Sequence, residues 1–173
     1  MRPLWARDAA FARSSCPKSE LRGAVWTATA LASSNSLRFD LVDHVLLVVH
    51  ADVPPTDEDW GRMVTVRNAN MQRLRGILVV APPRAVINTA QRADVAKFMR
   101  ETGHGIAVLT ESALIRGVAR AVGLLGVQVR AFAFSELGSA LNYLLVPVAR
   151  HAELTRRVEL MRSQLPPSAE ARS

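Results

Sequence analysis

The sequence predicts an α/β domain in which helices cover a mixed, mostly parallel five-stranded sheet. Residues 105–146 alternate between strand-like and helix-like patterns with almost no loop between them. Such alternation is typical of a parallel sheet covered by helices. Residues 36–50 form two adjacent strand-like runs joined by a short turn, so a β-hairpin is expected to open the sheet. About four covering helices and a C-terminal helical extension complete the expected fold.

Length and composition limit the classes to which this protein can belong. The 173 residues, 49% hydrophobic and 21% charged, suffice for one folded domain with tails. The single cysteine, Cys16, cannot form an internal disulfide and fits a reducing, cytoplasmic location. The net charge of +7 is spread along the chain without a basic run, so specific nucleic-acid binding is not expected. No apolar stretch reaches the ~20 residues of a membrane span.

The chain divides into four segments. Residues 1–35 are rich in Arg, Ser and Ala, and residues 23–32 resemble a short signal-peptide core. A flexible N-terminal extension is the preferred interpretation of this segment. Residues 36–146 form the predicted α/β domain, residues 147–165 a C-terminal helix and residues 166–173 a frayed tail.

In the first half of the domain, alternating residues from Leu37 predict a half-buried strand. Asp43-His44 makes a tight turn before the apolar strand 45–50. Thr56 is expected to cap a helix whose first turn, Asp57-Glu58-Asp59, suits the positive end of the helix dipole. Arg75-Gly76 ends this helix, and its expected core face consists of Trp60, Met63, Val64, Met71 and Leu74.

The middle of the domain repeats the pattern. Residues 77–80 are a fully apolar strand, and a proline-containing loop follows them. Asn88 with Gln91 three residues later predicts a capping box, and Gly103 ends the helix that it opens. Val95, Phe98 and Met99 form the expected inner face of this helix.

The second half continues with a strand at 106–109 and a helix over 112–126. The expected inner face of that helix is Leu114, Val118, Val122 and Leu125. Arg116 and Arg120 then lie on the opposite side, as a solvated or a docking surface. Residues 127–134 alternate as in an edge or half-covered strand. The following helix is expected to pack through Leu137, Leu141, Leu144 and Val148, with a kink or break at Pro147.

The C-terminal helix places four apolar residues on one stripe, at 4-3-4 spacing: Leu154, Val158, Met161 and Leu165. This spacing is compatible with a short two-helix seam between two copies of the chain. Packing of the same stripe against the protein's own domain explains it equally well. Both alternatives stay open at this level.

Residues of the types used in catalysis do not form a known motif. Gly103-His104-Gly105 precedes a strand and lacks the third glycine of a dinucleotide fingerprint. The histidines, His44, His50, His104 and His151, do not have zinc-site spacing. His50 and Asp52 follow a strand, a common place for active-site groups, although a structural strand-end histidine is the simpler interpretation. Neither an enzyme, a cofactor nor a metal site is predicted.

Five segments carry a resemblance to a known family: residues 88–92, 106–112, 114–121, 130–136 and 140–144. Over about residues 36–146 the chain resembles the STAS-like domains, which include bacterial anti-sigma factor antagonists and the lipid-binding CRAL-TRIO proteins. In the antagonists, a serine or threonine opening the helix after the third main strand is phosphorylated by a partner kinase. The corresponding place here is Asn88-Thr89, without the Asp-Ser-Ser-Gly-like pattern of those proteins. Thr89 is otherwise a cap-region residue.

The resemblance implies a non-catalytic regulatory or adaptor domain of bacterial type that binds a protein partner. The candidate interaction residues lie at two helix starts: Asn88, Thr89 and Arg92 at the first, and Ser112, Arg116 and Arg120 at the second. A phosphate at Thr89 would face free amide groups of a helix start. The alternative that the resemblance implies is binding of a lipid or another apolar small ligand.

Overall fold

The computed structural model describes residues 36–124 and 126–166. They form an α/β domain with one five-stranded sheet of strand order β1-β2-β3-β4-β5, which confirms the predicted fold class. The β1–β2 pair is antiparallel and all other pairs are parallel. The strands are β1 (Leu37–Val42), β2 (Val45–His50), β3 (Gly76–Val80), β4 (Gly105–Leu109) and β5 (Val129–Phe132).

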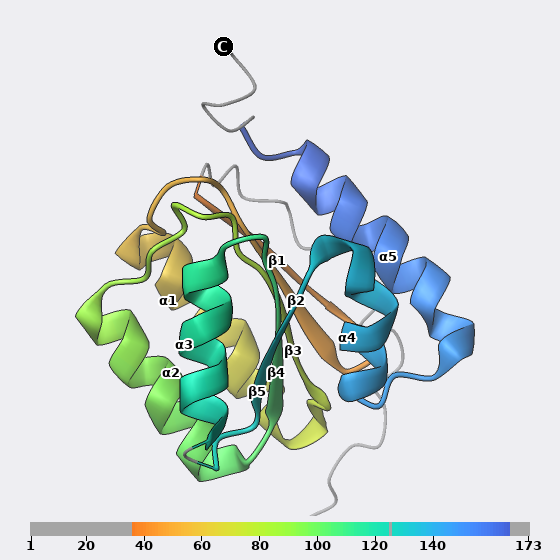
Figure 1. Ribbon diagram of the computed structural model, residues 1–173, viewed down its shortest axis with the longest axis horizontal. Helices are drawn as coiled ribbons and strands as arrows, with labels where there is room; N and C mark the ends of the chain where they lie inside the picture. Colours follow the sequence, from red (N-terminus) through yellow and green to blue (C-terminus); the bar gives the residue numbers. More distant parts are fainter. Residues whose placement is uncertain (1–35, 125, 167–173) are drawn as a thin grey trace, which may run out of the picture. The chain divides into compact units, whose positions relative to one another are not determined.

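The helices form one layer on each face of the sheet (Figure 1). They are α1 (Asp57–Ala69), α2 (Thr89–Thr102), α3 (Ala113–Leu124), α4 (Leu137–Tyr143) and α5 (Val148–Ser163), with 3-10 turns η1 (Met71–Arg73) and η2 (Phe134–Glu136). The helices α1, α2 and α3 cover one face, and α4 and α5 cover the other. Right-handed crossovers that always step to the next strand place every crossover helix on the same face. The other face is left to the chain after β5.

The hairpin that opens the sheet turns at the two predicted residues. Asp43 and His44 have φ of 48° and 68°, and Val42 pairs with Val45. A two-residue turn with both φ positive is the type I′ turn that suits twisted antiparallel strands. Asx residues and histidine tolerate this left-handed conformation better than branched residues do. The turn therefore sets the register of β1 on β2.

Each face of the sheet has its own hydrophobic core. The core under α4 and α5 contains Val45, Leu47, Val49, Leu78, Val80, Ala107, Leu109, Phe132, Ala140, Leu141, Leu144, Val146, Leu154, Val158 and Met161. The core under the crossover helices contains Leu37, Leu46, Val48, Trp60, Met63, Leu74, Ile77, Phe98 and Ile106. Successive residues of a strand point to opposite faces, so β2 supplies both cores and all six of its residues are buried.

A buried ion pair joins α1 to α2. The guanidinium of Arg67 donates to both carboxylate oxygens of Asp94, at 2.8 and 2.9 Å, although only 4% of Arg67 is exposed. The same guanidinium lies 4.6 Å from the centre of the Phe98 ring. The hydrogen bond from Arg67 holds the pKa of Asp94 below its usual value. The pair is a point where α1 and α2 are fixed in register.

The apolar stripe of α5 packs against the protein's own sheet. Leu154, Val158 and Met161 are buried, and Leu165 packs against the same core. Arg157 also forms an ion pair with Asp40 of β1. The self-packing alternative is therefore the one that the structure shows, and these side chains are not available for a two-helix seam between copies. The physical reason is that a buried sheet face has to be covered.

Two expected inner faces are right only in part. Leu141 and Leu144 are buried and Leu137 packs against the same core, as predicted. Val122 is half-buried, and Leu125 lies outside the described residues. Leu114 and Val118 of α3 are exposed, and the residue of α3 that is buried is Ala119. Val148 is 75% exposed because the preceding helix ends at Tyr143 and Leu145 takes a left-handed conformation (φ 57°). Within residues 36–124 and 126–166, no helix combines the length and the apolar character of a bilayer span.

We predict that Leu154→Ala lowers the free energy of unfolding by about 2–5 kcal/mol, since a fully buried leucine leaves a cavity when truncated. The matched control in the same helix is Leu160→Ala, where the side chain is 44% exposed and a change within about 0.5 kcal/mol is expected. Urea unfolding measures both. Light scattering should give the same molar mass for both variants and the wild type. A lower mass for Leu154→Ala alone would instead place this side chain in a contact between copies.

Candidate functional site

The carboxyl edge of the parallel strands brings together the loops that precede α1, α2 and α3. This edge is the usual position of binding sites in α/β sheets. The first two loops are joined directly, since the Asp52 carboxylate accepts from the Arg84 N–H at 3.0 Å. The Gln91 side chain donates to the carbonyl of Pro55 at 3.2 Å, which ties the start of α2 to the loop before α1. Hydrogen bonds between neighbouring loops therefore hold this edge together.

The start of α2 holds the first group of predicted residues. Asn88 and Gln91 form the predicted capping box: the Asn88 side chain accepts from the Gln91 N–H at 2.9 Å, and the Gln91 side chain accepts from the Asn88 N–H at 3.0 Å. The guanidinium of Arg92 donates to the Thr89 hydroxyl at 3.1 Å and to the Ile87 carbonyl at 3.2 Å. Asn88, Thr89 and Arg92 thus form one exposed cluster.

The start of α3 holds the second group. The Ser112 hydroxyl accepts from the Ile115 N–H at 3.3 Å, so Ser112 caps the helix as predicted. Arg116 donates to the Thr110 carbonyl at 3.3 Å and lies 3.7 Å from the Glu111 carboxylate. Arg116 therefore braces the helix start. Arg120 is exposed, without an ion-pair partner in the part of the chain that the structure describes.

The outer side of α3 is apolar and faces solvent. Leu114, Val118 and Leu124 are 77%, 55% and 84% exposed. Gly117 and Ala121 lie between them on the same side and are also exposed. We call these five residues the α3 face. The opposite side of the helix approaches the sheet closely: Ala119 is buried, and a Cβ on Gly123 would lie 3.3 Å from the Val129 carbonyl oxygen of β5.

Among the described residues, no hydrogen bond joins the strand-end residues His50 and Asp52. His50 is 7% exposed, and its buried Nδ1 has no hydrogen-bond partner among the described residues. Burial away from water lowers the pKa of His50 to about 4, so its imidazole is neutral at physiological pH. Asp52 is used in bracing the loops. Within the two described stretches, no three His, Cys, Asp or Glu side chains gather as metal ligands.

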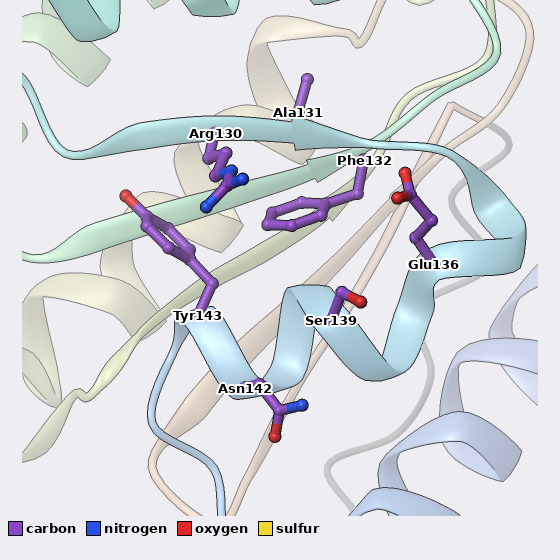
Figure 2. A pocket seen from close by; sticks show the side chains of 7 residues that line it. All are labelled: Arg130, Ala131, Phe132, Glu136, Ser139, Asn142 and Tyr143. Atoms are coloured by element: carbon purple, nitrogen blue, oxygen red, sulfur yellow. The ribbon is translucent and has the colours of Figure 1, made fainter.

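A groove that the sequence did not reveal lies between β5 and α4. Its volume is about 450 Å³, and its lining is Arg130, Ala131, Phe132, Glu136, Ser139, Asn142 and Tyr143. Figure 2 shows the guanidinium of Arg130 between the rings of Phe132 and Tyr143. The signal that could have found it is the spacing of Glu136, Ser139 and Asn142 at i, i+3 and i+6, which puts polar side chains on one side of a short helix.

No family model and no curated protein matches this chain. The resemblance to STAS-like domains therefore stays a prediction from the sequence. The fold itself is established by the sheet order and by the two helical layers.

We predict that the stability of the protein falls as the pH drops from 6.5 towards 4. The pKa of His50 is lowered from 6.5 to about 4 on folding, so the unfolded chain binds more protons within this window. The contribution of neutral His50 to the free energy of unfolding is therefore fully present above pH 6.5 and is lost as the pH falls towards 4. We expect the free energy of unfolding to be roughly 2–3 kcal/mol smaller at about pH 4.5 than at about pH 8.

Urea unfolding of the wild type and of His50→Leu over this pH range measures the effect. The variant has no imidazole to protonate, so its profile should be flatter by that amount. Equal slopes for the two proteins would show that His50 does not control the loss.

Proposed function

We propose that this chain is a non-catalytic regulatory or adaptor domain of bacterial, cytoplasmic type, which acts by binding a partner protein at the α3 face and the neighbouring helix starts. The observation that carries the proposal is the exposure of Leu114, Val118 and Leu124 on one side of one helix. Single exposed apolar residues are ordinary, whereas several together on one element are typical of an interaction surface.

The charges around the α3 face indicate the chemistry of the partner. Residues 112–129 contain Arg116 and Arg120 and no acidic residue, but Arg116 lies 3.7 Å from the Glu111 carboxylate, so Arg120 is the cation of this stretch without an ion-pair partner among the described residues. Arginine binds carboxylates through two parallel hydrogen bonds and is frequent where protein interfaces gain most of their affinity. The partner that fits is a protein with an apolar strip bordered by acidic side chains.

The polar groups at the helix starts support binding rather than catalysis. Asn88 and Ser112 cap helices, and Arg116 bonds a backbone carbonyl. Each of these groups is used to position the backbone of the surface. The result is a rigid platform, which lowers the entropic cost of binding a partner.

The alternative of a lipid-binding module finds no supporting observation. A site for an apolar ligand is a cavity lined mainly by apolar side chains. The groove between β5 and α4 is lined mostly by polar residues. The helix α5, which would have to act as a lid, contributes Leu154, Val158 and Met161 to the core.

The experiment compares partner capture by variants of two exposed apolar surfaces. Leu114→Ser/Val118→Ser removes apolar contacts from the α3 face, and Val148→Ser/Leu160→Ser makes the same chemical change on exposed positions of α5. Neither pair should alter the fold, since none of the four side chains is part of the buried core. Tagged proteins are incubated with extract of the source organism, and bound proteins are quantified by mass spectrometry.

We expect a partner that the wild type and the α5 variant retain and that the α3 variant loses by about tenfold or more, as loss of central apolar contacts does. The purified partner should then bind Arg120→Glu more weakly than wild type in calorimetry. Equal capture by the α3 and α5 variants would remove the α3 face from the proposal.

We predict that Thr89→Glu weakens binding of the same partner several-fold while the fold is kept. Thr89 is the first residue of α2, where a carboxylate faces free amide groups and stabilises the helix by about 0.3–1 kcal/mol. The added negative charge repels an acidic partner. The matched control is Thr65→Glu on α1, an exposed position away from the helix starts. Calorimetry with both variants measures the difference, and identical affinities would exclude the start of α2 from the interface.

A further inference from the structure

The β5–α4 groove contains a cationic group with an ordered position. Arg130 is exposed, and no carboxylate in the described residues lies within ion-pair distance of it. Its guanidinium lies 5.4 Å from the centre of the Phe132 ring, and Tyr143 flanks it on the other side (Figure 2). Stacking on an aromatic ring orients the planar guanidinium and leaves its N–H groups at the edge for an anion. Arg130 is a preoriented anion-binding group.

The strand that carries Arg130 is an edge strand of the sheet. The backbone carbonyl of Gln128 accepts from the N–H of Ile106 in β4 at 2.8 Å, so the carbonyl of Gln128 points towards β4. The carbonyl of Phe132 accepts from Thr110 at 2.9 Å in the same way. In a strand, the backbone N–H and carbonyl of one residue point to one side, and those of the next residue point to the other side. The N–H and the carbonyl of Ala131 therefore point away from β4, towards the open side of the sheet.

Both ends of this open edge are already closed. The N–H of Ala133 donates to the Glu136 carboxylate at 2.8 Å. The N–H of Val129 donates to the Val127 carbonyl at 2.8 Å. Only Ala131, between them, offers both a donor and an acceptor. A long strand cannot add to this edge, but one residue of an extended chain can pair there.

We propose that the β5–α4 groove binds an extended acidic peptide segment of a partner protein. One peptide residue pairs with the backbone of Ala131, and the adjacent residue is an Asp or Glu whose carboxylate binds Arg130. The pattern follows from strand geometry. Figure 2 shows the Ala131 side chain directed away from the groove and the Arg130 side chain directed into it. A peptide residue beside Arg130 therefore also points its side chain into the groove.

The other groove residues define the sequence that the peptide can have. Ser139 and Asn142 lie on the exposed side of α4 and make the lining of the groove polar. Glu136 lies at the other end of the groove, beyond Phe132. Its negative charge repels a second acidic residue there. The groove therefore selects a single carboxylate at the Arg130 end over a run of acidic residues.

This site is independent of the α3 face. It lies on the side of the sheet that α4 covers, whereas α3 lies on the other side (Figure 1). Binding of an acidic peptide here can therefore succeed or fail whatever the outcome for the α3 face.

The experiment measures the affinity of short peptides by fluorescence polarisation. The probes are labelled extended peptides rich in valine and threonine, with Glu, Gln or Lys at the central position and mixed flanking residues. The proteins are the wild type, Arg130→Met, Ala131→Pro and the matched charge control Arg100→Met, at an exposed position of α2. Circular dichroism and thermal unfolding establish that each variant is folded. Arg130→Met removes the charge but keeps an apolar side chain beside Phe132. If Ala131→Pro does not fold, the binding data for Arg130→Met alone test the proposal.

We expect peptides with central Glu to bind at least about tenfold more tightly than those with Gln, as a charge-assisted bidentate contact implies. Arg130→Met should lose this preference, Arg100→Met should keep it, and Ala131→Pro should bind no peptide. In NMR spectra, the backbone amide signals of Arg130 and Ala131 should shift when the Glu peptide is added.

Three results would overturn the proposal: no binding by any peptide, equal affinity for Glu and Gln peptides, or equal loss in the two arginine variants. N-acetylglutamate is the small-molecule competitor. If it displaces the Glu peptide at equal concentration, the groove binds carboxylates without backbone pairing, and the peptide assignment is wrong.

Discussion

Both faces of a largely parallel sheet must be covered, and this requirement governs the rest of the structure. Each crossover from β2 to β5 steps to the next strand, so α1, α2 and α3 all lie on one face. The opposite face is equally apolar, because the inner strands are buried on both sides. The chain after β5 has to cover it, and α4 and α5 do so. The C-terminal helix is thus a necessary part of the domain.

The same arrangement determines which surfaces are left for recognition. The helix α3 lies at the end of the sheet and approaches β5 through Ala119 and Gly123. Leu114, Val118 and Leu124 lie on its other side and face solvent. On the other face, the short helix α4 leaves a polar groove beside the edge strand. Both candidate surfaces therefore arise where the sheet ends and where the covering layers are thinnest, while the centre of the sheet is fully used for packing.

The candidate site could be predicted in part from the sequence. Local signals identified the helix starts, because a cap is formed by residues three positions apart: Asn88 with Gln91, and Ser112 with the N–H of Ile115. Three features were missed, the last two because they depend on contacts between elements that are distant in the sequence. These are the bracing role of Arg116, the exposure of the α3 face, and the groove around Arg130. Periodicity identifies the apolar side of a helix, but it does not say whether a sheet lies beneath that side.

The sequence by itself determined the fold class, the order of the elements and the hairpin at Asp43-His44, because turns, caps and the period of apolar residues act over a few positions. Only the tertiary structure decided which apolar stripes became core. The stripes of α3 and α5 look alike in the sequence, yet Leu114 is exposed and Leu154 is buried. The difference lies in the area of sheet available to each helix. On the face that the crossovers leave uncovered, α5 packs over β1 and β2, whereas α3 packs on the edge strand β5.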